Sequence, residues 1–117
     1  MSYQPGLHIL AEFNTAQTSL LQSNVPCKTL FTQLITKYGL QNVGEVYHDF
    51  PGGGFTAVVC LTESHLSIHT WPEYQLATFD VFLSNYKKDN SAKARSIYQD
   101  VLSFFDGTEI HKKEIAR

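Results

Sequence analysis

Twelve consecutive residues, 62–73, bring several side chains that could do chemistry close together in the sequence. They read Thr-Glu-Ser-His-Leu-Ser-Ile-His-Thr-Trp-Pro-Glu, with two serines, two histidines and two glutamates. Hydroxyl, imidazole and carboxylate groups together are the ingredients of nucleophilic catalysis, in which a base activates an attacking oxygen. The apolar run Phe55–Leu61 directly before them predicts a buried strand, so the reactive groups would follow a core element.

The alternation of side chains along a strand limits which of these groups meet. If the segment is itself a strand, alternate residues share one face. Ser64 and Ile68 then point to one face, whereas His65 and His69 point to the other. Ser64 and His69 therefore meet only through a bend or across a neighbouring strand.

The elements that position this segment follow from apolar periodicity and turn residues. A helix begins at Pro26 and stops at Gly39, after a loop or short helical turn over residues 14–24. A second helix spans Asp89–Phe105. The remaining strands are predicted at Leu7–Phe13, Val43–Phe50, Leu76–Ser84 and, as a last edge strand, Thr108–Ile115. This order predicts an α/β (α+β) two-layer sandwich: a mostly antiparallel sheet with two main helices on one face, in a single domain over residues 1–117.

Composition excludes several classes of function. The 117 residues carry a net charge of -2, and no Lys/Arg cluster exceeds two residues, so we expect no nucleic-acid partner. Apolar runs are too short for a membrane span, and the N-terminus has no signal pattern, so we expect no membrane association. Cys27 and Cys60 are predicted to be buried apolar residues in a reducing cytoplasm. His65 and His69 lack a third ligand, so no metal site is expected.

The literal string goes further than periodicity. Residues 63–74, Glu-Ser-His-Leu-Ser-Ile-His-Thr-Trp-Pro-Glu-Tyr, resemble the self-cleavage signature of the small prokaryotic S-adenosylmethionine decarboxylases, which are pyruvoyl-dependent enzymes of polyamine synthesis. Residues 7–13 resemble the first strand of that family, 48–56 its loop and strand before the cleavage site, and 77–82 the strand after it. The resemblance covers the chain from about Leu7 to Ser84 and implies the fold of that family.

The resemblance implies that the Glu63-Ser64 peptide bond breaks without a protease. The Ser64 hydroxyl would attack the preceding carbonyl to give an ester, and β-elimination would leave a pyruvoyl group at residue 64. The products would be a β chain, 1–63, and an α chain, 64–117. The pyruvoyl ketone would bind the substrate amine as a Schiff base and accept electrons as carbon dioxide leaves. Without the surrounding string, Ser64 would be interpreted as a turn serine beside a capping Glu63.

The same resemblance assigns roles to further residues. His69 matches a histidine that moves the elimination proton, and Thr56 matches a hydroxyl that assists the same processing. Glu73 matches the carboxylate that holds the ribose diol, and Phe50 matches an aromatic ring that stacks on adenine, although core packing is an alternative for Phe50. Trp71, in the same string, is placed with the substrate-binding residues.

One position departs from the family pattern. After the strand at 80–82 the family typically has Thr-Cys-Gly, whose Cys protonates the substrate carbon, whereas this chain has Leu83-Ser84-Asn85. A Ser84 hydroxyl is a far weaker acid than a thiol. Three functions therefore stay open: decarboxylation of S-adenosylmethionine for spermidine synthesis, decarboxylation of arginine or ornithine on the same scaffold, and a non-catalytic homologue. We expect a cytoplasmic homodimer of cleaved protomers, because the resemblance implies that protomers complete each other's sites.

Overall fold

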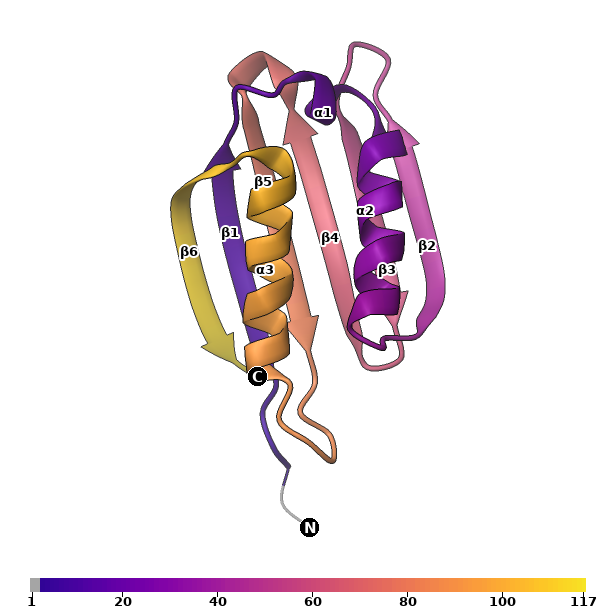
Figure 1. Ribbon diagram of the computed structural model, residues 1–117, viewed down its shortest axis with the longest axis vertical. Helices are drawn as coiled ribbons and strands as arrows, with labels where there is room; N and C mark the ends of the chain where they lie inside the picture. Colours follow the sequence, from indigo (N-terminus) through magenta and orange to yellow (C-terminus); the bar gives the residue numbers. More distant parts are fainter. Residues whose placement is uncertain (1–2) are drawn as a thin grey trace.

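The computed structural model describes residues 3–117 as one antiparallel sheet with helices against it (Figure 1). Its strands are β1 (Leu7–Asn14), β2 (Asn42–Asp49), β3 (Phe55–Leu61), β4 (Ser64–Trp71), β5 (Leu76–Leu83) and β6 (Thr108–Ala116). Its helices are α1 (Ser19–Gln22), α2 (Asn24–Lys37) and α3 (Ser91–Phe105), and a 3₁₀ turn, η1, spans Pro72–Tyr74.

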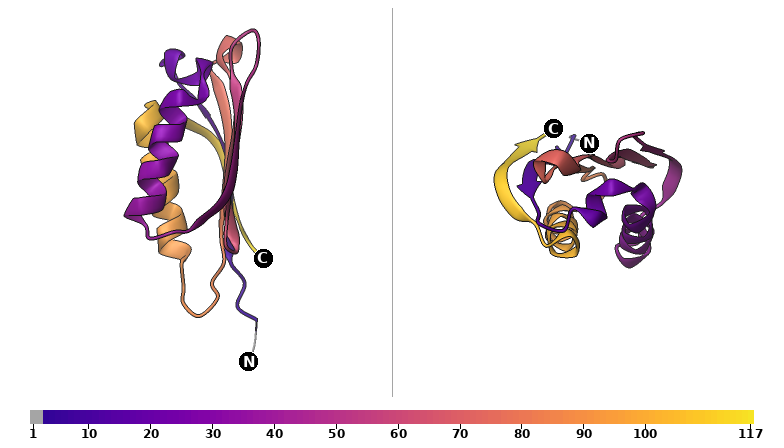
Figure 2. Two further views of the ribbon diagram at one scale, coloured as in Figure 1. Left: turned by 90° about the vertical axis from the view of Figure 1, so that its right-hand side faces the viewer. Right: turned by 90° about the horizontal axis from the view of Figure 1, so that it is seen from above.

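The strands lie in the order β2-β3-β4-β5-β1-β6, and every neighbouring pair is antiparallel. The helices α2 and α3 lie side by side on one face, and Figure 2 shows that no helix covers the other face of the described sheet. The predicted two-layer sandwich is therefore confirmed. Among the described residues, no helix is both long and apolar enough to cross a membrane.

The core lies between the sheet and the helices because alternate strand residues face inward. In β3 and β4 the inward positions are buried, and the positions between them are half-buried or exposed. The ring of Phe31 on α2 lies 6.2 Å from the ring of Phe79 on β5, which in turn stacks on Tyr98 of α3. Each such buried side chain contributes about 1.5–3 kcal/mol to folding. The core thus fixes which face of β4 remains open.

The first long helix begins earlier than the sequence pattern predicts. It starts at Asn24, because the Ser23 hydroxyl accepts the Val25 N–H at 3.2 Å and caps the helix there. Pro26 falls in the first turn, where its missing N–H has no intrahelical partner in any case. The predicted stop at Gly39 is confirmed, since Gly39 adopts φ +64°, a conformation that favours glycine.

The prediction that Cys60 is buried is wrong. Phe55–Leu61 does form a strand, but only one of its faces packs on the helices. Because Phe55 points inward, Cys60 has the opposite parity and is exposed on the uncovered face. Cys27, in contrast, is fully buried, and that burial raises the pKa of its thiol. The two cysteines therefore lie in different environments.

Candidate active site

The Glu63-Ser64 bond lies at the tip of the hairpin that joins β3 to β4. Thr62 and Glu63 form its two-residue turn, and Leu61 pairs with Ser64 to close it. The Ser64 hydroxyl is half-buried and accepts the N–H of Ser84 at 3.1 Å. The Ser84 hydroxyl donates to Oε2 of Glu63 at a longer 3.5 Å. The structure therefore brings together three of the predicted site residues, Glu63, Ser64 and Ser84.

The loop after β5 is held by side-chain amides, which fix the position of Ser84. The Asn85 amide oxygen accepts the N–H of Asn90 at 2.6 Å, and Asn90 donates its own amide to the carbonyl of Ser84 at 2.9 Å. Asn85 also donates to the carbonyl of Pro5 at 2.9 Å. These bonds tie the loop to the segment before β1, so Ser84 is positioned by its backbone and by two neighbouring asparagines.

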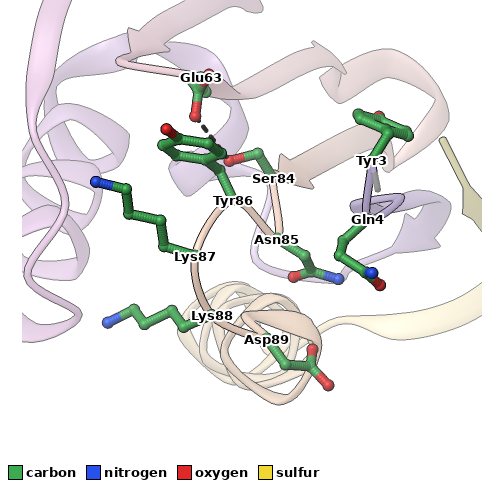
Figure 3. Close-up of a pocket in the computed structure, with 9 residues that line it drawn as sticks. All are labelled: Tyr3, Gln4, Glu63, Ser84, Asn85, Tyr86, Lys87, Lys88 and Asp89. Atoms are coloured by element: carbon green, nitrogen blue, oxygen red, sulfur yellow. Dashed lines mark hydrogen bonds between the residues drawn. The ribbon is translucent and has the colours of Figure 1, made fainter. Parts of the chain in front are cut away.

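A cavity of about 790 Å³ lies beside this hairpin (Figure 3). Its walls come from the segment before β1, the hairpin tip and the loop between β5 and α3. The lining residues are Tyr3, Gln4, Glu63, Ser84, Asn85, Tyr86, Lys87, Lys88 and Asp89. The cavity is large enough for a small-molecule ligand, and it borders the peptide bond at which cleavage is predicted.

The second group of predicted residues lies at the other end of β4. His69 pairs with Thr56 across the β3–β4 ladder, and Thr56 Oγ1 lies 2.9 Å from His69 Nδ1. Both side chains are half-buried on the face that no helix of the described chain covers. The contact at Nδ1 fixes the orientation of the imidazole ring and leaves Nε2 for proton exchange.

Two exposed rings and a carboxylate extend this second group. Phe50 and Trp71 each have 36% of their surface exposed, so Phe50 is not a core residue. The Trp71 ring centre lies 6.3 Å from that of His69. Glu73 is exposed in η1, directly after β4. A Cβ added at Gly54 would lie 3.2 Å from the Phe50 ring and 3.1 Å from Pro72, so both segments flank this glycine.

Within one chain the two groups do not meet. The β3–β4 pairing keeps one register from Thr56–His69 to Leu61–Ser64, with no bulge. Ser64 and His69 are five positions apart along the strand, which is a distance of about 17 Å. The two side chains also point to opposite faces, as their parity predicts. The bend that could have joined them is absent from β4.

A histidine cluster that the sequence pattern does not reveal lies next to the cleavage end. His8 on β1 is buried, with 7% of its surface exposed, and its Nε2 lies 3.6 Å from Asp80 Oδ2 on β5. The His65 ring packs edge-on against that of His8, with centres 5.4 Å apart. Burial first, and then the neighbouring His8, lower the pKa of His65. The cluster forms through register across three strands, which no local pattern encodes. Residues 3–117 hold no group of three or more ligating side chains placed for a metal ion.

Comparison with known proteins identifies the family to which this fold belongs. The fold is that of a solved S-adenosylmethionine decarboxylase: the crystal structure of the adenosylmethionine decarboxylase from Aquifex aeolicus superposes with a TM-score of 0.80 at 28% identity, over 99% of this chain and 91% of that one. The sequence profile described as S-adenosylmethionine decarboxylase matches residues 7–117. This chain therefore belongs to the S-adenosylmethionine decarboxylase family.

Two relatives show how far the similarity extends. A protein from Archaeoglobus fulgidus is 39% identical over 77 residues, which are 66% of this chain and 69% of the relative. One from Hydrogenobaculum is 30% identical over 112 residues, which are 96% of this chain and 81% of the relative. Both are named S-adenosylmethionine decarboxylase proenzyme.

Proposed function

We propose that this chain is an S-adenosylmethionine decarboxylase proenzyme that cuts itself between Glu63 and Ser64. The observation that carries the proposal is the position of Ser64: it follows a tight hairpin turn and its Oγ accepts the Ser84 N–H, in a family whose relatives are named proenzymes. The hydroxyl that would attack belongs to the residue directly after the Glu63 carbonyl, at the tip of the hairpin. The cut divides the chain into 1–63 and 64–117.

The cleavage chemistry balances with one water molecule. The Ser64 hydroxyl adds to the Glu63 carbonyl, the C–N bond breaks, and an ester replaces the amide. Residue 64 then loses its α-proton, and the Glu63 carboxylate leaves from its Cβ. This elimination creates a double bond between Cα and Cβ of residue 64. Water then adds at Cα, the amino nitrogen of residue 64 leaves as ammonia, and residue 64 becomes a pyruvoyl group. His69, oriented by Thr56, is the group that we assign to the elimination proton.

The residues around Ser64 fit such a group. Ser64 supplies the oxygen on Cβ that both attack and elimination require, and the adjoining cavity gives room for a substrate. When present, the group supplies a ketone that binds a substrate amine and withdraws electrons as carbon dioxide leaves. Ser84, which stands where the family typically has a cysteine, is the residue that we assign to the proton donor, and its hydroxyl lies within 3.5 Å of the Glu63 carboxylate.

We assign substrate binding to the opposite end of β4. The exposed rings of Phe50 and Trp71 are free to stack on a nucleoside base, and stacked rings also attract a sulfonium cation. The exposed Glu73 carboxylate has two acceptor oxygens for a ribose diol. These roles favour S-adenosylmethionine over arginine or ornithine, neither of which carries a base or a ribose.

We further propose a homodimer in which two protomers complete each other's sites. The support is the separation of Ser64 from His69 within one chain, together with the sheet face that no helix of the described chain covers. That face carries half-buried Val58 and Phe82, apolar side chains that a second sheet would cover. If two such faces pack with their strands in opposite directions, the Ser64 end of one protomer meets the His69 end of the other.

Intact mass measurement and a carbon dioxide assay test this function. Two fragments of the masses expected for 1–63 and 64–117 support self-cleavage, and Ser64→Ala should give a single chain. Carbon dioxide release from S-adenosylmethionine, above that from arginine or ornithine, supports the substrate. A parent chain that stays whole after long incubation at neutral pH contradicts the cleavage, and stronger release from arginine or ornithine contradicts the substrate.

A further inference from the structure

Cleavage at Glu63, as proposed for this chain, would add a negative charge to the tip of the hairpin. Breaking the bond to Ser64 converts the Glu63 carbonyl into a second carboxylate, beside the one on its side chain. It also opens the turn that joins β3 to β4, and chain ends without a partner fray. The new terminus therefore needs a group to hold it at the edge of the cavity, and any such role depends on the proposed self-cleavage.

Two cations share this cavity with Glu63. Lys87 and Lys88 line it, and Figure 3 shows their side chains extending from the loop on the side away from Asp89. Lys87 has φ +67°, in the left-handed region that residues with a side chain rarely adopt. Its ammonium group lies 5.3 Å from the centre of the Tyr86 ring. The loop thus presents both lysines to the same cavity.

These loop lysines have no carboxylate partner within residues 3–117. Three Lys or Arg side chains elsewhere in that part of the chain are paired: Arg95 with Glu114 at 2.9 Å, Lys37 with Asp100 at 2.8 Å, and Lys112 with Glu114 at 3.6 Å. The carboxylate of Asp89, next to the lysines in sequence, instead accepts the N–H of Ser91 at the start of α3. Asp89 therefore contributes a negative charge to the cavity but forms no ion pair with either lysine.

A third ammonium group adds to the positive charge here. Lys93, in the first turn of α3, lies close enough to Lys88 that Lys88 contributes to lowering its pKa, after the larger effect of burial. Two like charges held together without an anion between them favour the arrival of one. The anion that the proposed chemistry produces at this place is the new carboxylate of Glu63.

We propose that Lys87 and Lys88 bind the carboxylate that self-cleavage creates at Glu63. The two lysines are positioning residues: they hold the end of the 1–63 fragment against the loop between β5 and α3 and keep it clear of residue 64. The loop that places Ser84 against the hairpin before the cut thereby also retains the hairpin after the cut.

The pKa of the new terminus tests this directly. In protein labelled with carbon-13 at C1 of glutamate, Glu63 is the one glutamate whose C1 changes from a peptide carbonyl to a carboxylate on the proposed cleavage. Its NMR shift therefore titrates alone. A free terminal carboxyl titrates near about 3.3–3.7, and we expect the parent to titrate about 0.5 lower, because nearby cations favour the charged form.

Matched variants isolate the lysines. Lys87→Gln/Lys88→Gln should return the pKa to the ordinary range, whereas Lys87→Arg/Lys88→Arg should keep it low. Lys112→Gln/Lys113→Gln removes an equal charge from edge strand β6 and should leave it unchanged. The loop glutamine variant should also release the 1–63 fragment several-fold faster in mild urea. Equal pKa values in the parent and this variant would overturn the lysine proposal while leaving cleavage intact. If no labelled carbon titrates in the parent or in any variant that keeps Ser64, the proposed cleavage is wrong, and this proposal is wrong with it.

Discussion

The two ends of β4 are built in different ways. At the Ser64 end the contacts come from a turn and a loop: a backbone N–H of Ser84 reaches a hydroxyl at the hairpin tip, beside a cavity. At the His69 end the contact is between side chains of paired strands, Thr56 and His69, on an open sheet face. The first end suits a reaction on the chain itself, since the groups that react are neighbours. The second suits proton transfer and ligand binding by oriented side chains.

In the proposed dimer, the unbroken ladder between the two ends would make each chain half of two sites. A flexible connection would let the ends approach, but a strand paired on both sides keeps them apart. We therefore expect each end to act on the opposite end of a second copy. Variants at each end of β4 test whether the two ends act on each other across a dimer. The largest effect is expected when a chain without Ser64 is combined with a chain without His69.

Complementation between two inactive chains should have an all-or-none result. Ser64→Ala lacks the hydroxyl that attacks, and His69→Ala lacks the imidazole for elimination, so each variant alone should stay uncut. Co-expressed with distinguishable tags, the two should cleave the His69→Ala chain, because its Ser64 meets the His69 of the other copy. Mass spectrometry of the tagged chains reads the result. If both chains stay uncut in a dimer shown to contain one copy of each variant, the proposal of a shared site is wrong.

Glu73→Gln should weaken substrate binding without stopping cleavage. Glutamine keeps the shape but loses the charge and one acceptor, and a hydrogen bond to a charged group is worth about 1.5–3 kcal/mol. We expect kcat/KM for S-adenosylmethionine to fall about 10- to 100-fold, mainly through KM. Glu73→Asp, which keeps a carboxylate, should lose less. Unchanged KM with slower cleavage would instead place Glu73 in the processing step.

Ser84→Cys should raise turnover on S-adenosylmethionine, by about tenfold if proton delivery limits the rate. A thiol releases its proton near neutral pH far more readily than an alcohol. Ser103→Cys, which adds a thiol to an exposed position of α3, is the control and should change nothing. No gain from Ser84→Cys with better turnover of arginine or ornithine would favour a rebuilt substrate site. No carbon dioxide from any substrate, with parent or variant, would favour a non-catalytic homologue.

Local patterns predict the elements well, because periodicity and turn residues act over a few neighbours. Strand and helix limits agree with the structure to within about two residues, which is the ordinary uncertainty of element ends. The early start of α2 escapes the prediction because Ser23 is a stronger start signal than Pro26. The burial of Cys60 is predicted wrongly because an apolar run suggests a strand covered on both faces, although the parity of Phe55 points Cys60 outward.

The candidate site is less accessible to sequence reasoning. The resemblance supplies Ser64, His69 and Ser84, but not the separation of His69 from the two serines, which depends on an unbroken register. The contact between His8 and Asp80 joins residues 72 positions apart by their numbering, through pairing of β1 with β5. Such contacts follow from the topology of the whole sheet, so a local pattern does not encode them.

A weaker effect concerns this histidine cluster at the Ser64 end. Burial and His8 lower the pKa of His65 below its ordinary value of about 6.5, although Asp80 acts in the opposite sense. The folded state then binds fewer protons than the unfolded state as the pH falls through that value, so the free energy of unfolding should decrease from about pH 7 to pH 5.

In the uncut Ser64→Ala background, His65→Gln should make the free energy of unfolding depend less steeply on pH, by an amount that corresponds to a fraction of one bound proton. His111→Gln, on exposed strand β6, should leave it unaltered. Urea unfolding at several pH values measures the slopes, and equal slopes for His65→Gln and its uncut parent would show that burial of His65 does not govern the acid response of this end of the sheet.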